Sequence, residues 1–129
     1  MKQLHFQEKY PITVVDVAKS ETLFQSVADI AVYFKSCISG TPNSIYIGIF
    51  DHYAHTMANG GDIAPDIHAA TNVLFCFGYT LPNPQVLAVR PRSIGIADLG
   101  DHFVISFLDA PVKIANDAMQ SWALGLRNI

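Results

Sequence analysis

Residues 45–55 read Ile45-Tyr46-Ile47-Gly48-Ile49-Phe50-Asp51-His52-Tyr53-Ala54-His55. The first six residues are apolar and three of them are isoleucine, and a run this short and this rich in β-branched and aromatic types predicts a strand. Alternation puts the isoleucines on one side of the strand and Tyr46 and Phe50 on the other. Because both sides are apolar, the pattern predicts a strand that is covered on both faces.

A short helix is predicted to follow this strand directly. Asp51 is a residue type that accepts hydrogen bonds from the free N–H groups of a first helical turn, and Gly60-Gly61 supplies a stop. His52 and His55 are three residues apart and therefore share one face of the helix.

The composition describes one apolar domain. A chain of 129 residues is the size of a single domain, so residues 1–129 are expected to share one core without disulfides or metal ions. Hydrophobic residues make up 50% of the chain and charged residues only 15%. A chain this apolar is expected to hide surface between copies of itself, which predicts a homodimer.

The same composition argues against several classes of partner. A net charge of −3 disfavours nucleic acid, because phosphate backbones are bound by clustered Lys and Arg. The longest apolar runs are far shorter than the roughly 20 residues of a membrane span. Residues 1–9 lack the apolar segment of a secretory signal, which predicts a cytoplasmic location. Cys37 and Cys76 fit no C-x-x-C pattern and are expected to be reduced core residues.

The N-terminal part of the chain predicts a strand and then a helix. Residues 12–17 are β-branched at nearly every position, which favours the first strand. Ser20 is predicted to cap a helix that ends at Gly40. Its apolar positions recur at helical spacing and are Phe24, Val27, Ile30 or Ala31, Phe34 and Ile38.

The C-terminal part predicts three more strands and a final helix. One helical turn is expected at residues 66–71 and the third strand at residues 72–79. Pro82 and Pro84 force a loop, after which residues 85–89 fit either a helical turn or an extended piece. Residues 93–98 and 102–108 flank a Gly-containing turn, a strong hairpin signal. Asp109 is then predicted to cap a helix with an apolar stripe of Ala115, Met119, Trp122 and Leu126.

The resulting order is β-α-β-β-β-β-α, with an extra short helix after the second strand. Hairpin-linked strands with helices at both ends of the chain predict an α+β domain whose antiparallel sheet is covered by helices on one face. One set of strand side chains contains unusually small residues, namely Gly48, Cys76, Gly78, Gly95 and Ala97. Small residues permit close approach by another body, so this set fits either a sheet-to-sheet homodimer or a ligand cavity.

Part of the chain resembles a known family. The matching segments are Phe50-Asp51-His52-Tyr53-Ala54-His55 with Gly60-Gly61, residues 72–78 ending in Gly78, the proline-bearing loop, and residues 90–96 through to Asp109-Ala110-Pro111. This layout is similar to the uncharacterised bacterial domain-of-unknown-function family 302. The chain departs from that family at Gly78-Tyr79, where the family usually has Gly-Asn-Pro, and by one inserted residue before Pro111. A separate uncharacterised bacterial family of the same fold is the alternative. The resemblance implies a TATA-binding-protein-like α+β fold, often dimeric, and no established activity.

Two interpretations account for the histidines. His52 and His55 could direct two imidazoles toward one metal ion, with His68 or Asp51 completing the set, since zinc takes neutral imidazole and carboxylate ligands. A helix cap at Asp51 and hydrogen-bonded structural histidines explain the same residues. Short motifs over-predict metal sites, so the structural interpretation is preferred.

Arg90 and Arg92 flank Pro91 and are the second candidate site. Two guanidinium groups on one side would suit a carboxylate or a phosphate. The preferred alternative is a solvated pair balanced by Asp98 or Asp101, because exposed arginines are common and usually have no functional role.

The sequence therefore supports two functional hypotheses and names no cofactor. The preferred hypothesis is a cytoplasmic homodimer that binds a small apolar or anionic molecule, or acts as an interaction module, without chemistry of its own. The competing hypothesis is a metal- or thiol-dependent enzyme with its site at Asp51, His52 and His55. A catalytic thiol is disfavoured because an active cysteine must be exposed and have a lowered pKa.

Overall fold

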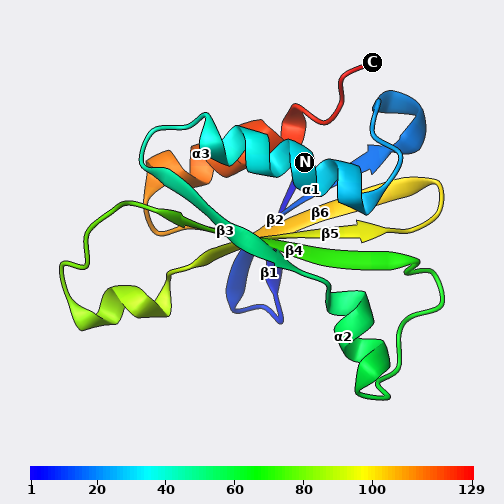
Figure 1. Ribbon diagram of the computed structural model, residues 1–129, viewed down its shortest axis with the longest axis horizontal. Helices are drawn as coiled ribbons and strands as arrows, with labels where there is room; N and C mark the ends of the chain where they lie inside the picture. The colour runs from blue at the N-terminus through cyan, green and yellow to red at the C-terminus, as the bar shows by residue number, and fades with distance from the viewer.

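The computed structural model describes residues 1–129 as a six-stranded antiparallel sheet with two long helices on one face (Figure 1). The strands are β1 (Lys2–Phe6), β2 (Tyr10–Ala18), β3 (Ser44–Phe50), β4 (Ala69–Phe77), β5 (Arg92–Asp98) and β6 (His102–Leu108). Their spatial order is β1-β2-β6-β5-β4-β3, and every neighbouring pair is antiparallel. The predicted α+β class and antiparallel sheet are confirmed, and the topology is compatible with a TATA-binding-protein-like fold.

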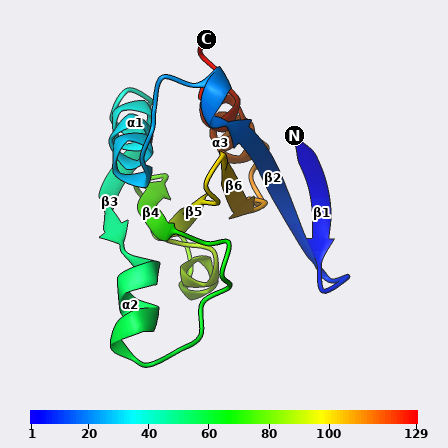
Figure 2. The same ribbon diagram turned by 90° about the vertical axis from the view of Figure 1, so that its right-hand side faces the viewer.

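Two long helices cover one face of this sheet. They are α1 (Val27–Ser39) and α3 (Lys113–Leu124), and Figure 2 shows both above the same face. The predicted short helix after the second strand of the sequence pattern is α2 (His52–Ala58), which lies on the opposite side. Two 3₁₀ turns complete the chain, η1 (Lys19–Glu21) and η2 (Pro84–Ala88). No helix has the length and apolar character that crossing a membrane requires.

The hydrophobic core lies between the sheet and the two long helices. Alternate residues of β2, β4, β5 and β6 point into it, and α1 and α3 contribute their apolar stripes. Its fully buried large side chains include Ile30, Phe34, Ile38, Phe75, Ile94, Ile105, Phe103 and Met119. Trp122 is 8% exposed and packs edge-on against Phe75, with ring centroids 5.5 Å apart. The predicted apolar faces of both helices are confirmed.

Strand β1 is an element that the sequence analysis missed. Residues 2–6 form a hairpin with β2, in which Leu4 lies opposite Ile12 and Phe6 opposite Tyr10. The segment has no β-branched residue and is exposed along its whole length, so it has no local strand signal. Backbone pairing with β2 places it, and the sheet has six strands instead of five.

Strand β3 is not covered on both faces, and this expectation was wrong. It lies at the edge of the sheet, where Ile45, Ile47 and Ile49 are about half exposed. The expected alternation also fails, because the register shifts between Tyr46 and Gly48. After this irregularity Phe50 lies opposite Asn72 and shares a face with Ile45, which lies opposite Cys76.

The two long helices begin later than predicted. Ser26, not Ser20, precedes α1, and its Oγ accepts a hydrogen bond from the Asp29 N–H at 3.1 Å. Asp109 does not cap α3, which begins after Val112 without a side-chain cap. The Asp109 carboxylate instead accepts a bond from the buried Thr13 hydroxyl at 2.7 Å. A buried hydroxyl without a hydrogen-bond partner costs free energy. Satisfying Thr13 therefore outweighs the preference of Asp109 for a helix cap.

Three further segments had a predicted or open conformation. The turn expected at residues 66–71 is wrong, because β4 already begins at Ala69. The open choice for residues 85–89 resolves as the 3₁₀ turn η2, which Asn83 caps by accepting from the Val86 N–H at 3.0 Å. The predicted hairpin of β5 and β6 is confirmed, with Gly100 at a φ of +98° in its turn.

Candidate functional site

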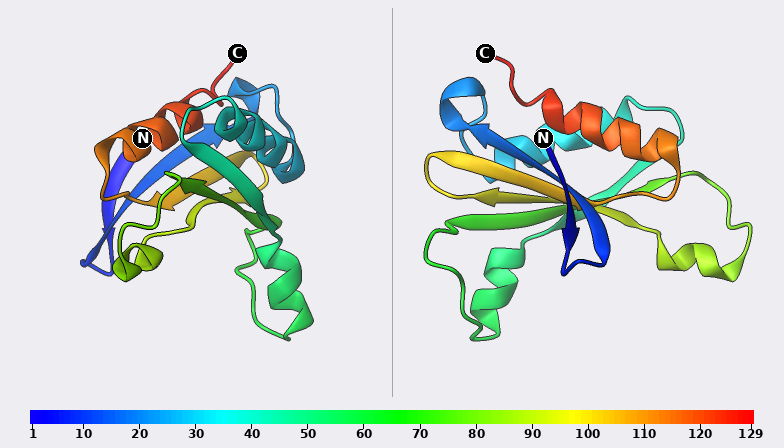
Figure 3. Two further views of the ribbon diagram at one scale, coloured as in Figure 1. Left: turned by 60° about the vertical axis from the view of Figure 1, so that its left-hand side comes forward. Right: turned by 180° about the vertical axis from the view of Figure 1, so that it is seen from behind.

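The face of the sheet opposite α1 and α3 has no helical layer. Figure 3 shows α2 and the η2 segment beyond the two ends of this open face. The small residues singled out from the sequence gather here: Gly95 lies opposite Ser106, Ala97 opposite Val104, and Gly48 opposite Leu74. Cys76 is on the same face, while Gly78 follows the end of β4. The sequence left open which set of side chains meets the helices, and the small set does not.

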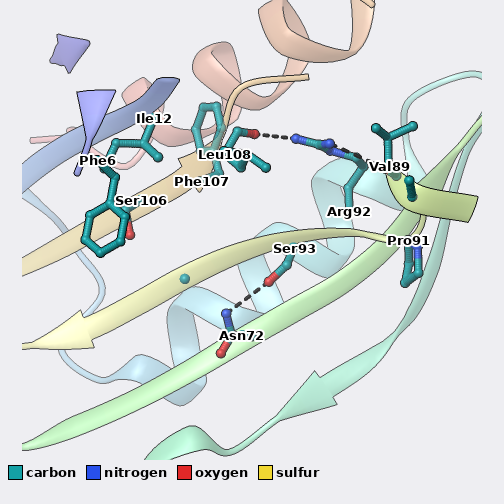
Figure 4. Close-up of a pocket in the computed structure, with 12 residues that line it drawn as sticks. Phe6, Ile12, Asn72, Val89, Pro91, Arg92, Ser93, Ser106, Phe107 and Leu108 are labelled. Carbon is teal, nitrogen blue, oxygen red and sulfur yellow. Dashed lines mark hydrogen bonds between the residues drawn. The ribbon is translucent and has the colours of Figure 1, made fainter. Parts of the chain in front are cut away.

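A groove of about 470 Å³ lies on this open face (Figure 4). This volume is typical of small-molecule sites. The groove is bordered by β-strand residues and by the segment around η2. Its lining residues are Phe6, Ile12, Asn72, Ala88, Val89, Pro91, Arg92, Ser93, Gly95, Ser106, Phe107 and Leu108. The missed strand β1 therefore contributes a wall of the groove through Phe6.

Polar side chains meet at the floor of the groove. Asn72 on β4 donates from Nδ2 to Ser93 Oγ on β5 at 2.9 Å, and Ser106 on β6 lies beside Gly95. A Cβ atom at Gly95 would lie 3.4 Å from the Ser106 carbonyl oxygen and 3.8 Å from Asn72 Nδ2. The glycine therefore keeps the floor open between the amide and the hydroxyl.

Asn72, Ser93 and Ser106 were not among the residues predicted from the sequence. Each stands on a different strand, and only the antiparallel register brings them together. The signal in the sequence was weak, because Asn72 and Ser106 are simply polar residues within mostly apolar strands.

The histidine pair lies at the margin of the open face. Asp51 caps α2 as predicted, because its Oδ1 accepts from the Ala54 N–H at 2.9 Å. The rings of His52 and His55 are 6.1 Å apart, and each contacts the ring of Phe50 at 5.3 Å and 5.0 Å respectively. His52 Nδ1 lies 3.3 Å from Asn72 Oδ1, so it donates to this amide oxygen and orients Asn72.

His68 does not join this pair. Its backbone N–H donates to the Asp98 carbonyl at 2.8 Å, and its ring lies beside Gly100 in the turn between β5 and β6. No group of three or more His, Cys, Asp or Glu side chains is arranged to hold a metal ion. The metal set of His52, His55 and His68 thus gains no support from their positions.

Arg90 and Arg92 border a second cavity of about 420 Å³, between the η2 segment and the start of α3. Arg90 donates to the Thr80 carbonyl. Its Nη2 would lie 2.8 Å from a Cβ at Gly78, whose φ of +102° also favours glycine. Both guanidinium groups were predicted to lie on one side, and both arginine residues line this cavity.

The expectation of a solvated arginine pair is wrong for Arg92. This side chain is only 7% exposed and donates to the Leu108 and Val89 carbonyls. The two acids proposed to balance it are engaged elsewhere: Asp98 pairs with Lys19 at 3.0 Å and Asp101 with His102 at 2.6 Å. Burial lowers the pKa of the Arg92 guanidinium, and the charge of Asp109 opposes this effect.

The cysteines do not form a thiol site with the histidines. Cys37 lies on α1 and is half-buried beside Tyr33. Burial raises the pKa of the Cys37 thiol, which disfavours the reactive thiolate. Cys76 is half-buried on the open face, opposite Ile45.

Residues 1–128 match the family described as Family of unknown function (DUF6858), and the chain belongs to this family. The expectation of an uncharacterised domain family is thereby confirmed, whereas membership of family 302 is not supported. No curated protein and no solved structure matches the chain.

Proposed function

We propose that this domain binds a small molecule in the groove of its open sheet face and performs no chemistry of its own. The observation that supports this proposal is the meeting of Asn72, Ser93 and Ser106 at the floor of an apolar groove of about 470 Å³. Apolar walls with a few convergent hydrogen-bonding groups are the usual composition of a ligand site.

The chemistry of the floor favours binding over catalysis. Amide and hydroxyl groups orient a ligand by hydrogen bonds, but neither exchanges a proton readily near neutral pH. His52 lines a smaller neighbouring cavity and meets the groove only through Asn72. In this proposal Asp51 and His52 position Asn72, and His55 supports Phe50 beside them.

A neutral fluorescent probe tests the groove. Phenylnaphthylamine should show saturable fluorescence enhancement with the parent protein. Gly95→Leu fills the floor and should weaken binding by about tenfold or more, equivalent to about 1.4 kcal/mol.

Gly48→Leu is the matched control for this experiment. Gly48 is on the same face, but it lies outside the groove and a Cβ there meets no atom within 4 Å. Equal binding by both variants, or no saturable binding by the parent, would contradict the proposed function.

The proposal includes a cytoplasmic homodimer joined along β3. Ile45, Ile47 and Ile49 are exposed on this edge strand, and proteins normally cover or charge such an edge. Light scattering coupled to size exclusion should show a parent dimer at micromolar concentration. Ile47→Lys should give a folded monomer, whereas Val32→Lys, at an exposed position of α1, should remain dimeric. A monomeric parent would exclude the dimer.

A further inference from the structure

Arg92 is a buried cation without an ion-pair partner. It is 7% exposed, and no carboxylate oxygen lies within 4.0 Å of its guanidinium. Two of its nitrogens donate to backbone carbonyls, but Nε is buried and has no hydrogen-bond partner. The charge-bearing Asp109 accepts bonds from Gln3 and Thr13 instead. A buried charge is costly unless it is paired, and an anion that accepts from Nε would offset this cost.

The cavity of about 420 Å³ that Arg92 lines has the composition of an anion site with room for an apolar body. Its twelve lining residues include Arg90 and Arg92 but no acidic residue, and seven of the twelve are hydrophobic. Phe77, Val86 and Ile114 are among these apolar walls. Arg90 reaches the cavity through the space left by Gly78.

The first turn of α3 opens on the same cavity. Val112, Ile114 and Ala115 line it, and no side chain caps the helix. The first N–H of α3 with a partner inside the helix is that of Asn116, which donates to the Val112 carbonyl at 3.1 Å. The preceding N–H groups and the positive end of the helix dipole favour negative charge at this position.

We propose that this cavity binds the carboxylate of a small molecule with an apolar body, held by Arg92, Arg90 and the start of α3. A carboxylate matches the planar fork of a guanidinium and has one charge to desolvate. Phosphate has more charge and would need more donors than the apolar walls supply. The site shares only Val89 and Arg92 with the groove, so it extends beyond the proposed function without depending on it.

Hexanoate is the probe for this site, and hexanol is its uncharged counterpart. In an amide NMR titration, hexanoate should bind saturably at millimolar concentration or below and shift the resonances of Ile114 and Ala115. Hexanol should bind at least about tenfold more weakly, because it lacks the charge-assisted hydrogen bonds. Inorganic phosphate should not compete.

A matched pair of variants at the mouth of the cavity tests the role of charge. Ile114 is 71% exposed, and a glutamate suits the first turn of a helix, so Ile114→Glu should fold. It should weaken hexanoate binding by about tenfold or more by repelling the carboxylate, whereas Ile114→Gln should retain binding. Arg92→Met, which keeps an unbranched side chain but removes the guanidinium, should also lose binding.

The outcomes separate this site from the groove. Gly95→Leu should leave hexanoate binding unchanged, so failure of one site is distinguishable from failure of the other. Absence of hexanoate binding, equal binding of hexanol, competition by phosphate, or full binding by Ile114→Glu would each overturn the carboxylate site.

Discussion

The two faces of one sheet differ in side-chain size and polarity, although the same strands form both. Along β5, Ile94 and Ile96 point into the core, whereas Ser93, Gly95 and Ala97 point to the open face. Successive side chains of a strand point to opposite faces, so neighbouring residues of β5 meet different surroundings. The helix-covered face buries the apolar side chains that stabilise the fold. The open face carries small and polar side chains instead.

Truncating a large side chain in the core of the covered face should cause the largest loss of stability. Trp122→Ala removes a nearly buried ring that contacts Phe75, and it should lower the free energy of unfolding by about 3–5 kcal/mol. Urea unfolding followed by circular dichroism measures this loss. A loss under about 1 kcal/mol would mean that α3 does not pack as described.

Neighbouring residues of β6 provide the sharpest comparison of the two faces. Ile105 is fully buried under the helices, so Ile105→Ala should cost about 2–5 kcal/mol. Ser106 points to the groove, and Ser106→Ala should change stability by less than about 0.5 kcal/mol. Chemical unfolding of both variants checks the pair, and similar losses would contradict the assignment of faces.

Helix α2 lies on the open side, and its cap should have a moderate, local effect. Asp51→Ala should lose about 0.5–2 kcal/mol, whereas Asp51→Asn should match the parent because asparagine caps equally well. Thermal melts with and without zinc then separate capping from metal binding. If zinc raises the melting temperature of the parent but not that of Asp51→Asn or His52→Ala, the metal-dependent alternative is favoured.

The smallest expected effect is a pH dependence at the rim of the covered face, where Lys19 pairs with Asp98. Burial by itself raises the pKa of Asp98, but hydrogen bonds from the Gly100 N–H and from Lys19 outweigh it and lower the pKa overall. The unfolded state then binds more protons, so this stabilisation is complete above the ordinary aspartate pKa of about 3.9. It is lost as the pH falls through the lower folded pKa.

Unfolding measured between neutral and acidic pH should reveal this contribution. Asp98→Asn should be less stable than the parent at neutral pH and should show a weaker decline below about pH 4. Asp117→Asn, which breaks the exposed Lys113–Asp117 pair, is the control and should remain close to the parent. Identical acid profiles of Asp98→Asn and the parent would contradict the linkage.

Local signals predicted some parts of this protein well. The Gly100 turn between two alternating strands, the apolar stripes of α1 and α3, and the cap at Asp51 each depend on a few adjacent residues. Such features follow from turn geometry, helical spacing and the free N–H groups of a first turn. Their prediction needed no knowledge of the rest of the chain.

Other parts depended on partners that are distant in sequence. Strand β1 is held in place by backbone pairing with β2. Asp109 accepts a hydrogen bond from the Thr13 hydroxyl instead of capping α3. The edge position of β3 could not be predicted, because strand order is a property of the whole sheet. For the same reason the sequence suggested an arginine pair but not the burial of Arg92.

The sequence by itself determined the α+β class, the hairpin, the helical stripes and the candidate residues Asp51, His52, Arg90 and Arg92, because periodicity and short-range chemistry specify them. Only the tertiary structure decided which face of the sheet is covered. It also brought Asn72, Ser93 and Ser106 to one floor and placed Arg92 and the start of α3 around one cavity. These arrangements depend on the register between strands and on packing across the core, which connect residues with no shared local pattern.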